Sequence, residues 1–174
     1  MFSDVIKNTL GKEPMKGPPM DIHLDETKNI VPVRVSSTKR TPLHLRDAEE
    51  KLVNRLLDQG IVVRVIKPTD WCAPSFVLAK PHQISGEEID ARLVTNYTGI
   101  NKFILRPVHP FPSPKEIRES ILPDSAVFIT MDALSGYFQL KLTEKASLMT
   151  TFLLGSGRYR YTRAPMGLAS SGDE

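Results

Sequence analysis

The sequence VFITMDALSGYFQLKL, residues 127–142, carries the strongest fold signal in this chain. Its apolar first half is rich in β-branched and aromatic residues and predicts a buried strand that ends at Asp132. A turn of small residues follows, and Tyr137 comes five positions after the acid. Because a carboxylate at the end of a buried strand costs free energy unless its charge is used, we expect a divalent metal ion as its partner. The alternative is an acid that caps the turn at Ser135 and Gly136.

The segment after the acid also suits nucleotidyl transfer, which uses magnesium ions held by oxygen ligands. Asp132 would be one such ligand. The backbone of Ala133 and Leu134 would face a triphosphate, and Tyr137 would lie under a sugar ring and reject a 2′-hydroxyl by its bulk.

The composition limits the class of protein, its compartment and its partners. The chain has 174 residues, a formal net charge of +3 and a hydrophobic content of 40%, which suits one packed domain and argues against global disorder. The small positive charge fits a polyanionic partner, and it equally fits solubility alone. Cys72 is the only cysteine and cannot form an internal disulfide, so we expect an intracellular protein, cytoplasmic or nuclear. No stretch is long and apolar enough to span a bilayer, so we expect no membrane partner.

Local signals divide the chain into a connector, residues 1–40, and a folded region, residues 41–174. The connector is expected to be largely irregular, with at most an edge strand at 30–35 because Pro32 interrupts it. The first confident element is a helix at 42–59, with Thr41 as N-cap and one apolar stripe. Further strands are expected at residues 61–66, 75–80, 91–97, 150–154 and 158–163. Further helices are expected at 114–122 and 144–149, with Ser113 and Thr143 as caps, and residues 164–171 suit a tight turn that enters a helix of small residues.

Two groups of basic residues have both a functional and a purely structural interpretation. Lys80 and Arg92 stand on the two strands of an expected hairpin, either as a basic flap that grips phosphates or as two solvated charges. Arg158 and Arg160 alternate with two tyrosines. The tyrosines would pack inward, and the arginines would be ordinary surface residues or contacts to nucleic-acid phosphates.

Seven short motifs occur in the order that is typical of one known family. They are LDQGI (57–61), WCAPSFVLAK (71–80), RLVTNY (92–97), NK (101–102), PFP (110–112), MDALSGYFQ (131–139) and PMGL (165–168). From residue 42 onward the chain resembles the N-terminal part of a reverse transcriptase, of the kind found in gypsy-type LTR retrotransposons and retrovirus-like Pol polyproteins. Residues 14–40 also resemble the segment between protease and polymerase in such polyproteins.

The resemblance implies an α+β fold made of the fingers and an incomplete palm of a right-hand polymerase, with no thumb. Asp132 matches the family's first catalytic, magnesium-binding aspartate, and Tyr137 matches its sugar-facing aromatic residue. Lys80 and Arg92 match the fingers residues that hold the incoming deoxynucleoside triphosphate. The remaining expected nucleotide-binding residues are Ala133, Leu134, Met166 and Gly167, and the expected nucleic-acid contacts are Asn101, Lys102, Arg158 and Arg160. The implied partners are an RNA or DNA template-primer, a deoxynucleoside triphosphate and the remainder of a polyprotein, and the implied cofactor is Mg²⁺.

The sequence departs from the family pattern in three places. Asn96 and Thr98 stand where the family commonly has an acid and an arginine, and no Asp-Asp pair occurs to form the second palm motif. The complete family enzyme is an RNA-directed DNA polymerase that uses two magnesium ions. We expect this chain alone to lack that activity and to leave an apolar face of its palm sheet exposed. The alternatives are a non-catalytic nucleic-acid-binding or regulatory protein derived from such an element, and a gene fragment without a selected function.

Overall fold

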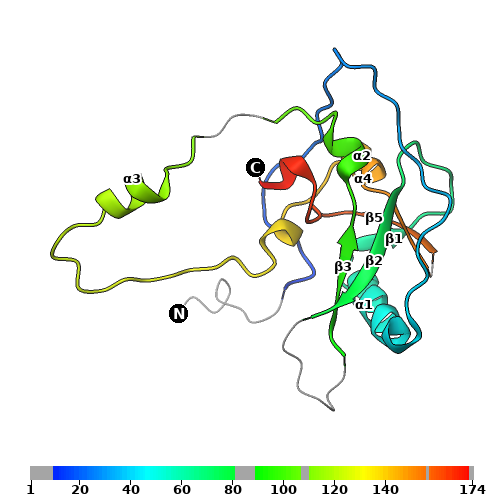
Figure 1. The fold of residues 1–174 in the computed structure, drawn as a ribbon, viewed down its shortest axis with the longest axis horizontal. Helices are drawn as coiled ribbons and strands as arrows, with labels where there is room; N and C mark the ends of the chain where they lie inside the picture. Colours follow the sequence, from blue (N-terminus) through cyan, green and yellow to red (C-terminus); the bar gives the residue numbers. More distant parts are fainter. Residues whose placement is uncertain (1–9, 81–88, 107–109, 156, 173–174) are drawn as a thin grey trace.

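A mixed five-stranded sheet forms the centre of the folded body in the computed structural model, which describes residues 10–80, 89–106, 110–155 and 157–172 (Figure 1). The order of the strands across the sheet is β1-β5-β4-β2-β3. The strands are β1 (Val62–Arg64), β2 (Ala73–Ala79), β3 (Ala91–Thr95), β4 (Phe152–Leu154) and β5 (Gly157–Tyr161).

Two antiparallel units make up this sheet. The β2–β3 hairpin is one unit, and β1, β5 and β4 form the other. A short parallel contact between the start of β2 and β4, at Ala73 opposite Phe152, joins them. The expected tip of the hairpin, residues 81–90, lies mostly outside the described residues.

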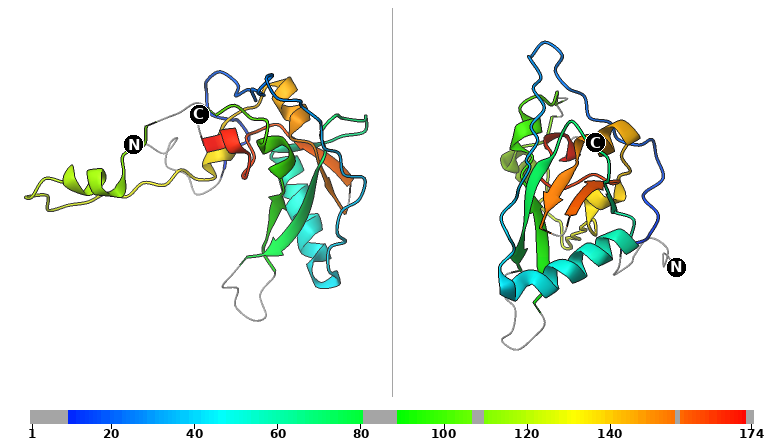
Figure 2. Two further views of the ribbon diagram at one scale, coloured as in Figure 1. Left: turned by 45° about the horizontal axis from the view of Figure 1, so that its top comes forward. Right: turned by 90° about the vertical axis from the view of Figure 1, so that its right-hand side faces the viewer.

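The helices are short except for α1. They are η1 (Leu43–Leu45), α1 (Arg46–Asp58), α2 (Thr98–Asn101), α3 (Pro114–Glu119), η2 (Gly136–Gln139), α4 (Glu144–Met149) and η3 (Ala169–Gly172), where η marks a 3-10 helix. Helix α1 lies along one end of the sheet and contacts both β1 and β3 (Figure 2). Its buried stripe of Ala48, Leu52, Val53 and Leu56 confirms the predicted helix and its apolar face. Within the described part of the chain, no helix has the length and apolar content needed to cross a bilayer.

The core centres on stacked aromatic rings. Phe152 lies 5.7 Å from Tyr159 and 5.0 Å from Tyr161 between ring centroids, and both tyrosines are buried as predicted. The predicted connector contributes to the same core, because Met20 and Ile22 are buried in it. Residues 10–40 form no helix or strand, and their β-pairing with the rest of the chain consists of isolated bridges. One of these bridges joins Arg34 to Cys72, in the segment where the sequence predicts an edge strand.

A long arm leaves this body. Residues 110–134 form a loop that carries α3 far from the sheet, and all of these residues are exposed (Figures 1 and 2). The predicted caps are confirmed: Ser113 forms a capping box with Glu116 on α3, and the Thr143 hydroxyl accepts from the N–H of Ala146 on α4. The predicted cap at Thr41 is wrong, because the chain enters α1 through η1 and no side chain caps either helix.

The predicted buried strand before Asp132 is also wrong. Residues 126–132 form no strand, and they make no backbone hydrogen bond within the described part of the chain. The side chains of Val127, Phe128 and Ile129 are 78%, 69% and 82% exposed. High β-propensity is not sufficient for a strand, because a strand also needs a neighbour that pairs with its N–H and C=O groups.

Candidate nucleotide and nucleic-acid site

Asn101, the last residue of α2, is hydrogen-bonded to the turn at Gly167. Its side-chain amide nitrogen donates to the Gly167 carbonyl at 2.9 Å, and its side-chain oxygen accepts from the Ala169 N–H at 3.0 Å. Gly167 has a φ of 85°, and a Cβ at that position would lie 3.6 Å from the Thr95 carbonyl oxygen. The turn therefore needs glycine for its backbone conformation, and it lies against the end of β3. Asn101, a predicted nucleic-acid contact, has both ends of its amide engaged within the chain.

Tyr137 lies on the same part of the body. Its hydroxyl is 3.7 Å from where a Cβ on Gly172 would be, at the end of the η3 helix that follows the Gly167 turn. The neighbouring Phe138 stacks on Tyr161 with 6.1 Å between ring centroids. The packing of Phe138 thus fixes the backbone at Tyr137, while the Tyr137 ring itself remains partly exposed.

The structure therefore brings Asn101, Gly167 and Tyr137 together. Two other predicted residues adjoin them in sequence: Met166 is 59% exposed beside Gly167, and Lys102 is exposed beside Asn101. Exposed side chains at these positions are accessible to a ligand that approaches the turn.

Asp132 stands apart from this group on the exposed arm. Its carboxylate makes no hydrogen bond to the Ser135–Gly136 turn among the described residues, so the interpretation as a turn cap is wrong as well. The Ala133 carbonyl accepts from the Gly136 N–H at 3.1 Å, and the Leu134 carbonyl accepts from the Gln139 side chain at 2.8 Å. Both carbonyls are therefore engaged in the turn that joins the arm to the body.

Magnesium ions require several oxygen ligands at one place. In residues 10–80, 89–106, 110–155 and 157–172, no group of three or more His, Cys, Asp or Glu side chains could hold a metal ion. Asp132 is exposed and has no second carboxylate in such a group. The described residues do not fit a two-magnesium site, and we derive no catalytic step through one.

Lys80 and Arg92 do share one face of the β2–β3 hairpin. Arg92 pairs directly with Leu78, so Lys80, two residues further along β2, lies on the same side of the hairpin. The Lys80 ammonium forms an ion pair with Asp90, and Arg55 approaches the same carboxylate at 3.8 Å. The hydrogen bond from Lys80 lowers the pKa of Asp90 below its ordinary value.

Two apolar side chains on that face were not singled out from the sequence. Phe76 and Leu78 are 38% and 39% exposed, and they alternate with inward residues along β2. A groove of about 750 Å³ runs beside them, and its other wall includes Lys39 and Arg40. The alternation of inward and outward residues along 73–79 was the available signal, since it leaves large apolar side chains on the outer face.

Arg158 and Arg160 lie on β5. Arg160 donates to Glu144 at 2.7 Å and to the Ser147 hydroxyl at 3.2 Å, and Arg158 donates to the Lys67 carbonyl at 3.3 Å. Both arginines are thus engaged within the chain, as the structural interpretation expects.

Comparison with known proteins gives relatives of one kind. The chain is 30% identical over 122 residues to a retrovirus-related Pol polyprotein from transposon 297 of Drosophila melanogaster, a match that covers 70% of this chain and 11% of that protein. The chain is homologous to a part of retrovirus-related Pol polyproteins. This Pol homologue is also 26% identical over 143 residues to the enzymatic polyprotein of figwort mosaic virus (strain DxS), which covers 81% of the chain and 21% of the viral protein. No family model matches the chain.

Solved structures give the same result for the fold. The native prototype foamy virus protease-reverse transcriptase matches with a TM-score of 0.70 at 19% identity, over 92% of this chain and 20% of that chain. The foamy viral protease-reverse transcriptase in complex with an RNA/DNA hybrid matches with a TM-score of 0.68 at 19% identity, over 92% and 20% of the two chains. The Pol homologue thus has a mixed fold similar to reverse transcriptase structures, and the resemblance predicted from the seven motifs is confirmed. It spans only about a tenth to a fifth of the length of its curated relatives.

Proposed function

We propose that this chain is the fingers region and the first part of the palm of a reverse transcriptase, and that it holds template and incoming nucleotide for RNA-directed DNA synthesis. The observation that carries the proposal is the outer face of the β2–β3 hairpin. That face combines the two cations Lys80 and Arg92 with the exposed Phe76 and Leu78. Cations suit phosphates, and exposed aromatic rings suit unstacked bases.

The Lys80–Asp90 ion pair supports this assignment. Both side chains of the pair are about half exposed, so the pair is worth little to stability and is easily exchanged for another anion. A triphosphate carries more charge than one carboxylate and would compete for Lys80. Arg92 could contact the same phosphates in the bidentate manner that a guanidinium allows.

The turn at Gly167 is proposed to lie along the nucleotide. The backbone at Gly167 can approach a ligand closely, and Tyr137 on the same part of the body would face the sugar. Asp132, with Ala133 and Leu134, is this chain's proposed contribution to a magnesium-dependent polymerase site, whose other ligands are not among the described residues.

Nucleic-acid binding tests the proposal directly. Fluorescence anisotropy with a labelled primed RNA template should show binding that weakens as salt rises, because phosphate contacts release counterions. Lys80→Ala and Arg92→Ala should each weaken binding and reduce the salt slope by about 1. Arg118→Ala, which removes an exposed arginine from the arm, is the matched control and should leave binding unchanged. Equal binding by all four proteins would contradict the assignment of the hairpin face.

Primer extension separates two versions of this function. We propose that the chain alone binds but does not polymerise, because the described residues present no group of carboxylates for metal ions. With magnesium and deoxynucleotides, we expect no incorporation. Robust incorporation that is lost in Asp132→Asn would overturn this and make the chain a complete enzyme. Salt-sensitive binding without incorporation would also fit the second candidate, a non-catalytic nucleic-acid-binding protein derived from a retroelement.

A further inference from the structure

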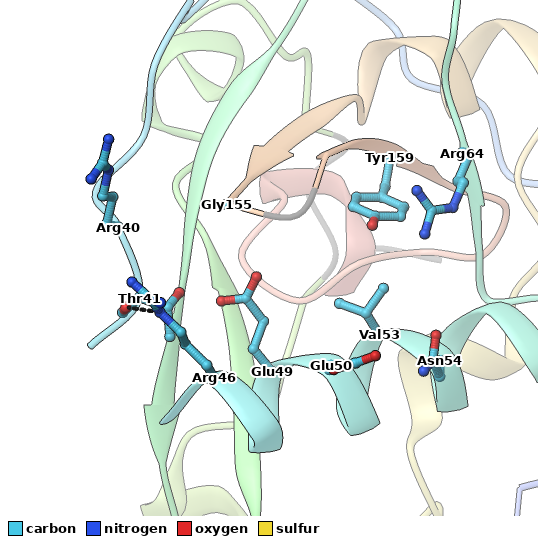
Figure 3. Close-up of a pocket in the computed structure, with 10 residues that line it drawn as sticks. All are labelled: Arg40, Thr41, Arg46, Glu49, Glu50, Val53, Asn54, Arg64, Gly155 and Tyr159. Atoms are coloured by element: carbon cyan, nitrogen blue, oxygen red, sulfur yellow. Dashed lines mark hydrogen bonds between the residues drawn. The ribbon is translucent and has the colours of Figure 1, made fainter. Parts of the chain in front are cut away.

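A pocket of about 470 Å³ lies between the first half of α1 and the β1–β5 edge of the sheet (Figure 3). It is separate from the outer face of the β2–β3 hairpin, and none of the predicted site residues lines it. Its charged lining residues are Arg40, Arg46 and Arg64 with Glu49 and Glu50. A volume of this size is within the range of small-molecule sites.

Glu49 is the unusual residue of this pocket. Its side chain points from α1 toward the β4–β5 turn, and a Cβ on Gly155 would lie 3.6 Å from one of its carboxylate oxygens (Figure 3). The residue is only 6% exposed. Among the described residues, no donor forms a hydrogen bond or ion pair with its carboxylate. Its carboxylate faces the pocket without a protein donor, so this geometry favours a ligand that brings N–H groups.

Arginines stand on both sides of that carboxylate. Arg64 lies over the ring of Tyr159 with its Cζ 5.4 Å from the ring centroid. The opposite face of an exposed guanidinium can stack on a nucleobase. On the other side, Arg46 donates through Nε to the Thr41 carbonyl at 3.5 Å, which leaves its terminal nitrogens for an anion. Arg40 lies beyond Arg46 on the same side of the pocket, and Figure 3 shows its guanidinium turned away from Glu49.

We propose that this pocket binds a guanine nucleotide, with Glu49 accepting from the base and Arg46 contacting the phosphate. Guanine presents two neighbouring donors, N1–H and the N2 amino group, which match the two oxygens of one carboxylate. Adenine and cytosine each place an acceptor beside their amino group, and uracil places its one N–H between two carbonyls. A carboxylate therefore selects guanine among the four bases, and the arginines exclude an uncharged base as the full ligand.

The proposal does not depend on polymerase activity, so binding of mononucleotides to the full chain tests it. Isothermal titration with GMP, AMP, CMP and UMP should show at least a tenfold preference for GMP. IMP, which lacks the N2 amino group, should bind several-fold more weakly than GMP. Glu49→Gln should abolish the preference, because the amide has one acceptor only, whereas the neighbouring Glu50→Gln should keep it. Equal affinity for all nucleotides, or an unchanged preference in Glu49→Gln, would refute the site.

A guanine nucleotide could be free or part of a single strand. A uridine oligonucleotide with one central guanosine should bind more tightly than the all-uridine oligonucleotide if the ligand is a strand, with the difference lost in Glu49→Gln. If the mononucleotides show the preference for guanine and the oligonucleotides do not, the ligand is the free nucleotide. If neither the mononucleotides nor the oligonucleotides show a preference for guanine, the proposal is overturned.

Thermal unfolding supplies a readout that a purely structural role would not give. GMP should raise the midpoint of the natural chain more than AMP does, whereas GMP and AMP should shift the midpoint of Glu49→Gln equally. A larger shift by GMP than by AMP that persists in Glu49→Gln would contradict the role of Glu49 in selecting the base.

Discussion

Arg163 is the residue on which three separate segments converge. Its guanidinium donates to the carbonyls of Phe138 at 3.1 Å, Gly11 at 3.3 Å and Gln59 at 3.5 Å, and also to that of Lys12. The residue is 3% exposed. Burial lowers the pKa of the guanidinium from its ordinary value. One side chain thus links the connector, the end of α1 and the η2 turn that supports Tyr137.

The first prediction concerns this arginine. Arg163→Met should lower the free energy of unfolding by about 2–4 kcal/mol, since it removes the side-chain donor that four carbonyls share. Arg163→Lys should recover only part of the loss because an ammonium lacks the planar fork of donors. Urea denaturation measures both changes. Arg118→Met on the exposed arm is the control, and a comparable loss there would show that the effect comes from charge alone.

The second prediction concerns the Lys80–Asp90 pair. Lys80→Met should raise the pKa of Asp90 toward its ordinary value of about 3.9, as measured by carbon NMR of the carboxyl group. Because the folded state lowers the Asp90 pKa, the pair stabilises the fold above the ordinary value and loses this contribution as pH falls through the folded-state value. The natural chain should therefore exceed the variant in stability at pH 5–7 by at most about 0.5 kcal/mol, given the exposure of the pair. The difference should vanish at lower pH; a difference that grows on acidification would contradict the assignment.

At the scale of elements, two capped helices of equal length differ in what they contact. Helix α3 has a capping box, with the Ser113 N–H donating to Glu116 at 2.6 Å, but none of its residues is buried. Helix α4 is capped by Thr143, which also donates to Asp21 at 2.8 Å, and it buries Ala146 and Ser147. Of these two helices, only α4 therefore packs against the core.

The third prediction follows from that contrast. Thr143→Ala should lower the free energy of global unfolding by about 1–2 kcal/mol. Ser113→Ala should leave global unfolding unchanged and should only melt α3 locally. Hydrogen exchange of residues 114–119 together with urea denaturation distinguishes the two. A global loss in Ser113→Ala would mean that the arm packs on the body.

The elements that the sequence predicts are those with local signals. The α1 stripe, the caps at Ser113 and Thr143 and the alternation in β5 each depend on residues a few positions apart. The arm could not be predicted in this way, because 126–132 has the composition of a strand and lacks only a partner strand. Arg163 and Glu49 were missed for a related reason. The bonds of Arg163 to Gly11 and Lys12 span about 150 residues, and Glu49 looked like an ordinary acid in the first turn of a helix.

For the whole molecule, the arm is an exposed apolar surface on an otherwise packed body. Extended segments with high β-propensity and unpaired backbone groups promote association between chains. The fourth prediction is that the double variant Phe128→Lys, Ile129→Lys associates less, as measured by light scattering at rising concentration. Its free energy of unfolding should stay within about 0.5 kcal/mol of the natural chain, since both side chains are exposed.

A buried phenylalanine provides the matched comparison. Phe152→Ala, at a residue that is 1% exposed, should cost about 3–5 kcal/mol of stability. If the arm variant loses a similar amount, or associates as readily as the natural chain, the arm is not the surface that drives association.

The strand order also determines when the sheet can form during synthesis of the chain. Val62 of β1 pairs with Tyr161 of β5, a separation of 99 residues, and the link between the two halves of the sheet needs β4. A ribosome that adds about 5–20 residues per second makes β1 roughly 5–20 s before its partner exists. During synthesis only the β2–β3 hairpin and α1 can form early, so the order in which strands emerge, more than any single contact, sets when this sheet can close.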